Sequence, residues 1–252
     1  MGPENTLAAF DRAMALGVDG LELDVRLSRD GVPVLLHDPL LDRTTNTAGA
    51  ITARTAAELA DVDAGFHFGP DEGYPFRGQG IGVPTLRAVL ARYPGTALIV
   101  EIKGGEAHLI HATLEDIRSA GAFDRVCIGS FSVKTLNAVR ALEPAATTSA
   151  ARADIHSLVW RSWVGRPLRS LPYDVCQAPY RFKQRRVLSR RMLRLLHAAG
   201  VPVQAFTVNE PEDVERLLDW GVDTIITDRP AMAVSAVRAW LAAPPGTPAL
   251  ER

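Results

Sequence analysis

Two carboxylates lie two residues apart in the segment Leu21-Glu22-Leu23-Asp24-Val25, which alternates in the manner of a β-strand. Side chains alternate between the two faces of a strand, so Glu22 and Asp24 share one face and the three apolar side chains share the other. Two ionised carboxylates on a buried strand are unfavourable unless a cation or hydrogen bonds compensate their charge. The pattern therefore predicts a cation site, with an exposed edge strand that has a polar face as the alternative.

A second apolar run, residues 98–102, carries Glu101 near its end and is followed by Lys103 on the same face. The carboxyl ends of barrel strands form the rim of an active site, so these two residues are expected to meet Glu22 and Asp24 there. Three carboxylates suit a hard divalent cation, Mg²⁺ or Ca²⁺, and the lack of clustered His and Cys argues against zinc. Lys103 is then suited to an anionic phosphate oxygen, or simply to an ion pair with Glu101.

His37 ends a short apolar segment that follows the turn at Asp30-Gly31. An isolated histidine is commonly structural, but one at a strand end beside a metal site is suited to act as a general acid or base. The other five histidines lie in loops or helical stretches and are not expected to take part.

The elements that position these residues alternate between strands and helices. We expect seven strands able to run parallel, near residues 22, 100, 128, 148, 177, 205 and 226, with a hairpin strand at 32–37. Helices are expected at 6–16, 106–120, 133–142, 189–199, 212–220 and 232–241. No Gly-rich dinucleotide loop supports a doubly wound sheet, so the pattern favours a TIM (β/α)8-type barrel that lacks its first strand.

Residues 39–83 are rich in Thr, Gly and Pro and are expected to form a small insertion after the second strand. The prediction is one domain over residues 1–242, followed by a disordered tail at 243–252. The net charge of −1 gives no general reason to expect nucleic acid as a partner. Cys127 and Cys176 are expected to be buried free thiols. With no transmembrane-length run and no signal segment, we expect a cytoplasmic protein, although a chain with a missing start could have lost a signal.

Two further signals are weaker. Seven arginines and lysines lie between residues 181 and 194 without a nearby acid in the sequence. They are expected to form a solvated helix face, or to border the active-site mouth and attract anionic substrates or lipid headgroups. Trp160 and Trp163 are expected to pack over the barrel mouth, with a lipid-gripping rim as the alternative. Contact with a membrane is compatible with this segment but is not predicted, and the oligomeric state is not predicted either.

Taken together, the chain resembles the glycerophosphodiester phosphodiesterase family. The matching motifs occur in order from residue 3 to about residue 240, and they are Pro3-Glu4-Asn5-Thr6, Glu22-Leu23-Asp24-Val25, Asp30-Gly31, His37-Asp38-Pro39, Pro84-Thr85-Leu86, Glu101-Ile102-Lys103, Ser130-Phe131, Thr207-Val208-Asn209 and Ile226-Thr227-Asp228-Arg229-Pro230.

The resemblance implies a TIM barrel in which Glu22, Asp24 and Glu101 bind one divalent cation, Mg²⁺ or Ca²⁺. It also implies that Lys103 lies near the phosphate, that Glu4 orients or binds at the same site, and that His37 is one of a pair of catalytic histidines. The family's first strand ends in His-Arg-Gly shortly before the Pro-Glu-Asn-Thr motif, whereas only Met1 and Gly2 precede Pro3 here. We therefore expect the true chain to continue upstream and the 252-residue chain to have low activity.

The expected function is hydrolysis of glycerophosphodiesters to glycerol 3-phosphate and an alcohol. A lysophospholipase D-like activity on lysophospholipids is one alternative, and a non-catalytic barrel is the alternative if the present start is genuine. The expected partner in either enzymatic case is a small-molecule phosphodiester.

Overall fold

The computed structural model describes residues 1–164, 168, 170–183 and 185–242 of the chain. The tail at 243–252, which we expected to be disordered, lies outside the described residues. The chain divides into two compact units, Met1–Thr147 and Thr148–Arg252. The single domain expected from the sequence stays a prediction.

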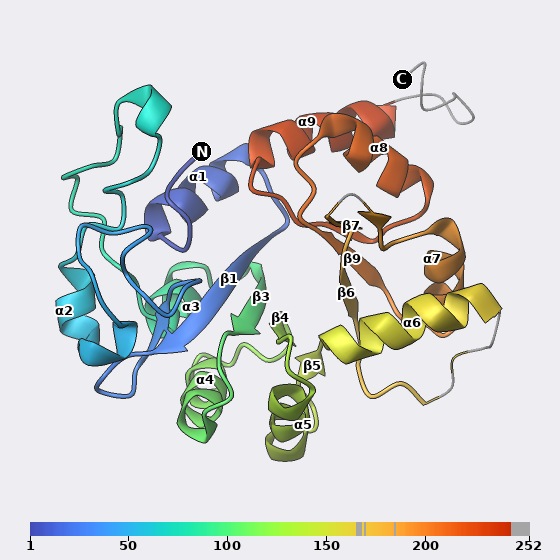
Figure 1. The fold of residues 1–252 in the computed structure, drawn as a ribbon, viewed down its shortest axis with the longest axis horizontal. Coiled ribbons are helices and arrows are strands. Elements are labelled where there is room, and N and C mark those ends of the chain that lie inside the picture. The colour runs from blue at the N-terminus through green and yellow to red at the C-terminus, as the bar shows by residue number, and fades with distance from the viewer. Residues whose placement is uncertain (165–167, 169, 184, 243–252) are drawn as a thin grey trace. The chain divides into compact units, whose positions relative to one another are not determined.

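The first unit is built on a sheet with the strand order β2-β1-β3-β4-β5, and Figure 1 shows β1 in blue and β3 in green. Strand β1 (Gly20–Leu27) pairs in parallel with β3 (Ala97–Ile102), and β3 pairs in parallel with β4 (Val126–Gly129). Strand β2 (Pro33–Leu35) runs antiparallel to β1, and β5 (Thr147–Thr148) ends the order. Buried Leu, Val and Ile side chains of β1, β3 and β4 supply the main core of this unit.

Helix α1 (Leu7–Leu16) begins where the hydroxyl of Thr6 accepts a hydrogen bond from the Ala9 amide at 3.2 Å. It ends at Gly17, whose φ of 83° lies in the left-handed region that glycine adopts at low cost. The remaining long helices of this unit are α4 (Ala107–Ser119) and α5 (Val133–Leu142), close to their expected bounds.

The segment 39–83 contains no strand of the sheet, and the insertion expected there is confirmed within the described chain. It holds the short helices η1 (Ile51–Ala53), α2 (Ala56–Ala60) and η2 (Pro70–Glu72). It has a small apolar core of its own, to which Leu41, Leu59 and Val83 contribute. This core anchors an otherwise irregular segment beside the end of β2.

The second unit has a parallel sheet in the order β10-β9-β6. Its strands are β6 (Cys176–Pro179), β9 (Val203–Phe206) and β10 (Thr224–Ile225), and its helices are α6 (Arg152–Val164), α7 (Arg190–His197), α8 (Pro211–Asp219) and α9 (Pro230–Ala242). A two-stranded hairpin, β7 (Arg181–Phe182) and β8 (Arg185–Arg186), lies between β6 and α7 (Figure 1).

All seven strands expected from the sequence are present, and three expectations need correction. Helix α3 (Leu86–Arg92) was not expected, although Thr85 caps it through a hydrogen bond from the Ala88 amide. Helix α6 was not expected either, because its apolar pattern is weak. Finally, Cys176 is buried but Cys127 is only partly so, since it lies on the face of the sheet that carries Ile99, while its neighbours Val126 and Ile128 enter the core on the other face.

Candidate metal and phosphate site

Parallel register places the carboxylates predicted to bind a cation side by side. Asp24 of β1 lies opposite Glu101 of β3, and Glu22 precedes Asp24 by one pleat on the same face. One oxygen from each of the three carboxylates can be chosen so that all lie within 4.8 Å of one another. The three residues predicted from the two sequence runs are therefore brought together, and the edge-strand alternative is wrong because Asp24 is buried.

Lys103 lies between two of these carboxylates. Its Nζ is 2.8 Å from Glu101 Oε1 and 3.1 Å from Asp24 Oδ1, and its side chain is largely buried. Burial alone would lower the pKa of Lys103, but the charge of Asp24 and the hydrogen bond to Glu101 raise it above its usual value. Lys103 is therefore a permanent cation at the site.

The three carboxylates share the positive charge of one lysine ammonium. Burial raises the pKa of Glu101, and Lys103 only partly offsets this effect. Glu101 Oε1 is buried, and it lies 2.8 Å from Lys103 Nζ, which also serves Asp24. Burying carboxylates is costly unless their charge is balanced, and a bound cation would relieve that cost.

The oxygen spacing suits one divalent ion. Oxygens on opposite sides of an ion are separated by twice the metal–oxygen distance, which is about 4.2 Å for Mg²⁺ and about 5 Å for Ca²⁺. One oxygen from each of the three carboxylates lies within 4.8 Å of the others, so their separations are compatible with one shared ion. All the donors are hard oxygens, so the residues present fit either cation.

Asn5 holds Asp24 in place, a role that sequence reasoning missed. Its Nδ2 donates to Asp24 Oδ2 at 2.8 Å, and its Oδ1 accepts from the Asp24 backbone N–H at 2.9 Å. Asn5 adopts a φ of 55°, which asparagine tolerates better than most residues. The hydroxyl of Thr6 caps α1, which leaves the Asn5 side chain for Asp24.

His37 lies just beyond β2, and Asp38 orients it. His37 Nδ1 is 2.7 Å from Asp38 Oδ1, so the other ring nitrogen, Nε2, is the one left to exchange protons with a ligand. Hydrogen bonds from Arg43 and His37 lower the pKa of Asp38 to about 2. Asp38 is therefore a carboxylate throughout the neutral range and favours one orientation of the ring.

Arg43 connects Asp38 to Glu4. Its Nε donates to Asp38 Oδ2 at 2.5 Å, while its two terminal nitrogens donate to the two carboxylate oxygens of Glu4 at 2.8 and 2.6 Å. Glu4 thus contacts Arg43 and is not a member of the carboxylate group around Asp24. No signal in the sequence singled out Arg43 among the 28 lysines and arginines.

Arg26 ties the backbone around His37 to that around Lys103. It donates from Nε and Nη2 to the His37 carbonyl at 2.9 and 2.6 Å, and from Nη1 to the Lys103 carbonyl at 2.9 Å. One guanidinium therefore keeps the chain segments that carry the histidine and the lysine at a set separation. Phe131, whose side chain is exposed, lies with its ring centroid 5.4 Å from Lys103 Nζ.

Comparison with known proteins shows the family to which the chain is similar. The model of the glycerophosphoryl diester phosphodiesterase family matches residues 1–232. The chain is 33% identical over 245 residues to a glycerophosphodiester phosphodiesterase of Caldanaerobacter subterraneus subsp. tengcongensis, and the match covers 94% of this chain and 93% of that protein.

Two solved structures are similar over nearly their whole length. The glycerophosphoryl diester phosphodiesterase domain of a Mycobacterium tuberculosis protein has a TM-score of 0.82 at 24% identity, covering 93% of this chain and 94% of that one. An Oleispira antarctica phosphodiesterase, solved in complex with the product sn-glycerol-3-phosphate, has a TM-score of 0.76 at 28% identity, covering 94% and 92%. The fold is the TIM barrel of these enzymes, and the chain belongs to the glycerophosphoryl diester phosphodiesterase family.

Proposed function

We propose that this chain carries the site for metal-dependent hydrolysis of a glycerophosphodiester to sn-glycerol 3-phosphate and an alcohol. The observation that carries the proposal is the group of three carboxylates, Glu22, Asp24 and Glu101, whose oxygens lie within 4.8 Å of one another beside the Lys103 ammonium. The related enzyme solved with sn-glycerol-3-phosphate supports the class of product.

Each residue has a role that follows from its chemistry. Glu22, Asp24 and Glu101 hold one Mg²⁺ or Ca²⁺, which when bound neutralises phosphate charge and can activate an oxygen nucleophile. Lys103 donates hydrogen bonds to a phosphate oxygen, and its ammonium stabilises charge that develops there. His37 moves a proton at Nε2, to or from an oxygen of the reacting phosphodiester.

Glu4 acts from outside the metal ligands. It engages both terminal nitrogens of Arg43, which holds Asp38 and through it the His37 ring. We therefore assign Glu4 to positioning and not to direct contact with phosphate, in contrast to the expectation from the sequence resemblance that it binds or orients within the site.

A second substrate class is favoured by one observation. Phe131 is 52% exposed and its ring lies beside Lys103, which in this proposal meets the phosphate. An exposed aromatic side chain at that place suits an apolar group attached close to the phosphodiester, as in a lysophospholipid. The assay below therefore includes both classes.

The test separates cation binding from turnover. Calorimetric titration with Mg²⁺ and with Ca²⁺ is carried out on the wild type, on Glu101→Gln and on the control Glu72→Gln, which changes an exposed carboxylate in the insertion. We expect binding of one cation by the wild type and by the control, and a loss of affinity in Glu101→Gln. Unchanged cation binding in Glu101→Gln would remove the basis of the proposal.

Turnover is measured as release of sn-glycerol 3-phosphate from glycerophosphocholine and from a glycerophosphodiester of p-nitrophenol. For lysophosphatidylcholine it is measured as release of choline, because the other product is 1-acyl-sn-glycerol 3-phosphate. The p-nitrophenol ester needs no proton on its leaving group, so its hydrolysis tests the metal and Lys103 without dependence on a leaving-group acid. Cation-dependent cleavage of this ester that is lost in Lys103→Met supports the proposal. Cation binding without cleavage of any of the three would favour the non-catalytic alternative.

A further inference from the structure

The second unit carries a surface whose cations are not neutralised by its own acids. In the β7–β8 hairpin, Arg181 pairs across the strands with Arg186, and Phe182 pairs with Arg185. Like charges directly opposite each other destabilise a strand pair unless something compensates them. Arg181 is compensated, because its Nη2 is 3.0 Å from Asp213 Oδ1.

The other cations of this segment lack such partners. Among the described residues, no acid lies within ion-pair distance of the remaining six, which are Lys183, Arg185, Arg186, Arg190, Arg191 and Arg194. All six are exposed. The positive charge of this segment is therefore available to an external anion.

Exposed aromatic side chains lie on the adjoining elements. Phe182 is 56% exposed in the hairpin, and in α6 Trp160 and Trp163 are 58% and 77% exposed. The two tryptophans are three residues apart and so lie on the same side of the helix, away from buried Ile155 and Leu158. Three of the four exposed aromatic residues in the described part of the chain thus occur within residues 160–182.

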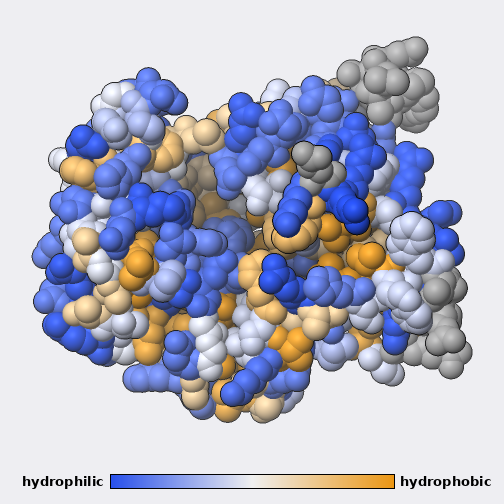
Figure 2. Space-filling model, in the orientation of Figure 1, coloured by the Kyte–Doolittle hydropathy of each residue, from blue (hydrophilic) through white to orange (hydrophobic). Residues whose placement is uncertain are grey.

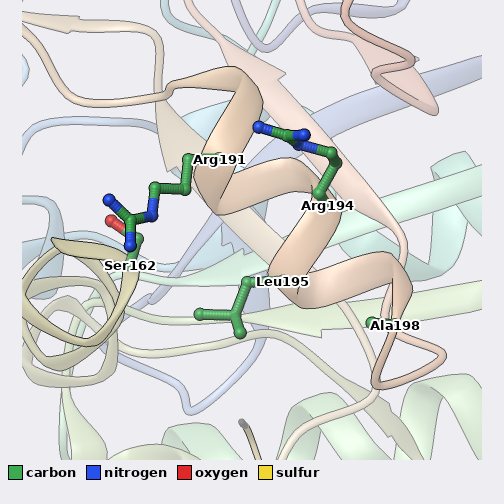
Figure 3. Close-up of a pocket in the computed structure, with 5 residues that line it drawn as sticks. All are labelled: Ser162, Arg191, Arg194, Leu195 and Ala198. Carbon is green, nitrogen blue, oxygen red and sulfur yellow. The ribbon is translucent and has the colours of Figure 1, made fainter. Parts of the chain in front are cut away.

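Helices α6 and α7 lie together, so the tryptophans and the cations belong to neighbouring elements. A hollow of about 340 Å³ opens between them and is lined by Ser162 of α6 and by Arg191, Arg194 and Leu195 of α7. In Figure 3, Arg191 extends toward Ser162 while Leu195 lies between the helices. Figure 2 shows strongly hydrophilic atoms beside hydrophobic ones where Figure 1 places the hairpin.

We propose that the β7–β8 hairpin, the exposed side of α7 and the tryptophan side of α6 form a docking surface for an anionic phospholipid bilayer. Unpaired lysine and arginine side chains match anionic headgroups, and tryptophan and phenylalanine side chains insert at the boundary between headgroups and acyl chains. No described helix is long and apolar enough to cross a membrane, so the contact is peripheral. Nucleic acid also offers phosphates, but tryptophans that stand exposed on a helix flank favour the lipid interface.

The test is flotation of the full 252-residue chain with vesicles of phosphatidylcholine, with and without phosphatidylglycerol. We expect binding only when phosphatidylglycerol is present, and its loss when salt is raised to about 1 M, where screening acts within a few ångströms. The hairpin variant Lys183→Gln/Arg185→Gln/Arg186→Gln removes three cations, each worth about fivefold in binding, so its partition coefficient is expected to fall on the order of a hundredfold.

A control variant removes the same charge from the first unit through Arg54→Gln, Lys134→Gln and Arg140→Gln, and it is expected to bind vesicles as the wild type does. Both variants are checked for an unchanged thermal transition. Equal loss of binding in the two variants, or no binding of the wild type to vesicles with phosphatidylglycerol, overturns the proposal. Binding of single-stranded RNA in preference to these vesicles overturns it as well.

Quenching by brominated lipids gives a readout that does not depend on the charge variants. The chain has four tryptophans, and Trp220 and Trp240 are partly buried elsewhere in the unit. We expect brominated lipids to quench the tryptophan fluorescence of the wild type. In Trp160→Leu/Trp163→Leu most of this quenching is expected to disappear. Equal quenching in that variant would show that the bilayer meets another surface.

Discussion

The buried contact between Asn5 and Asp24 is the best-defined interaction behind the site, and Asn5→Gly tests it directly. Asn5 makes two hydrogen bonds to Asp24, at 2.8 and 2.9 Å, and the two residues are 9% and 5% exposed. Because Asn5 has a φ of 55°, glycine accepts this backbone conformation without strain. The substitution therefore removes the side chain and leaves the chain path intact.

The expected loss of stability can be worked out from these two bonds. The bond to the Asp24 carboxylate involves a charged acceptor and is worth about 1.5–3 kcal/mol, while the bond from the Asp24 amide is worth about 0.5–1.5 kcal/mol. The sum is about 2–4.5 kcal/mol, a large part of the free energy of unfolding of a domain, which is about 5–15 kcal/mol. Since Asp24 is also a proposed metal ligand, loss of its orienting partner is expected to weaken cation binding by about 10–100-fold.

Urea unfolding in the presence of a chelator measures the first effect, and calorimetric titration measures the second. The matched control is Lys183→Gly, because Lys183 has nearly the same φ, 56°, but is exposed and makes no buried hydrogen bond. The control accounts for the entropy that glycine adds to the unfolded chain. If Asn5→Gly and Lys183→Gly lower the free energy of unfolding equally, Asn5 does not stabilise Asp24.

Three other predictions concern the cation, the acid side of the stability profile and the thiols. Saturating Mg²⁺ or Ca²⁺, at about a hundred times Kd, is expected to raise the Tm of the wild type by about 5–10 °C in scanning calorimetry. The Tm of Glu101→Gln is expected to change little, and an equal rise in this variant would contradict the assignment of Glu101 as a ligand. Asp38 has its pKa lowered from 3.8 to about 2, so its stabilisation is present above pH 3.8 and is lost as the pH falls toward 2. Because Asp38 is partly exposed, this contribution is about 1 kcal/mol. In Asp38→Asn the free energy of unfolding is expected to fall less steeply with pH over that window than in the wild type, and parallel curves for the two proteins would argue against this role. Burial raises the pKa of Cys176 to about 12, so iodoacetamide is expected to modify no more than one thiol of the native protein, that of Cys127. Two adducts detected by mass spectrometry before denaturation would contradict the burial of Cys176.

Much of the site follows from simple periodicity. The alternation of residues 21–25 places Glu22 and Asp24 on one face, and the parallel register then sets Glu101 opposite Asp24. The helix at 133–142 was predicted with its observed bounds, and the strand at 97–102 lies where one was expected near residue 100, because each has a clear apolar pattern and clear flanking residues. The strands 20–27 and 203–206 lie where strands were expected, near residues 22 and 205, and hydrogen bonding rather than the apolar pattern decides their end residues.

The supporting contacts could not be predicted in the same way. The pairing of Asn5 with Asp24 joins residues 19 apart and depends on how α1 enters the sheet. The bonds from Arg26 to the carbonyl groups of His37 and Lys103 join backbone positions whose side chains carry the chemistry. Helices α3 and α6 were missed because one is short and the other has no strong apolar face; their stability comes from packing against the two cores.

Arg43 gives the last prediction, because a single side chain links three groups of the site. Its planar guanidinium donates at once to Asp38 and to both oxygens of Glu4, which a point charge cannot do. These contacts raise the pKa of Arg43, so the cation persists at every pH at which the protein is folded. Arg43→Lys keeps the charge but is able to satisfy only one of the two carboxylates at a time.

Loss of the simultaneous hydrogen bonds from the guanidinium allows the Asp38 side chain to adopt other orientations, and the ring of His37 with it. Proton transfer at Nε2 depends on that orientation, whereas binding of the phosphodiester depends on the cation site and Lys103. We therefore expect Arg43→Lys to lower kcat on glycerophosphocholine about tenfold or more with little change in KM, and to leave the cation titration unchanged. Arg77→Lys, at an exposed arginine of the insertion, is the matched control. A rise in KM at constant kcat would instead place Arg43 in contact with substrate, because only loss of ground-state binding produces that pattern.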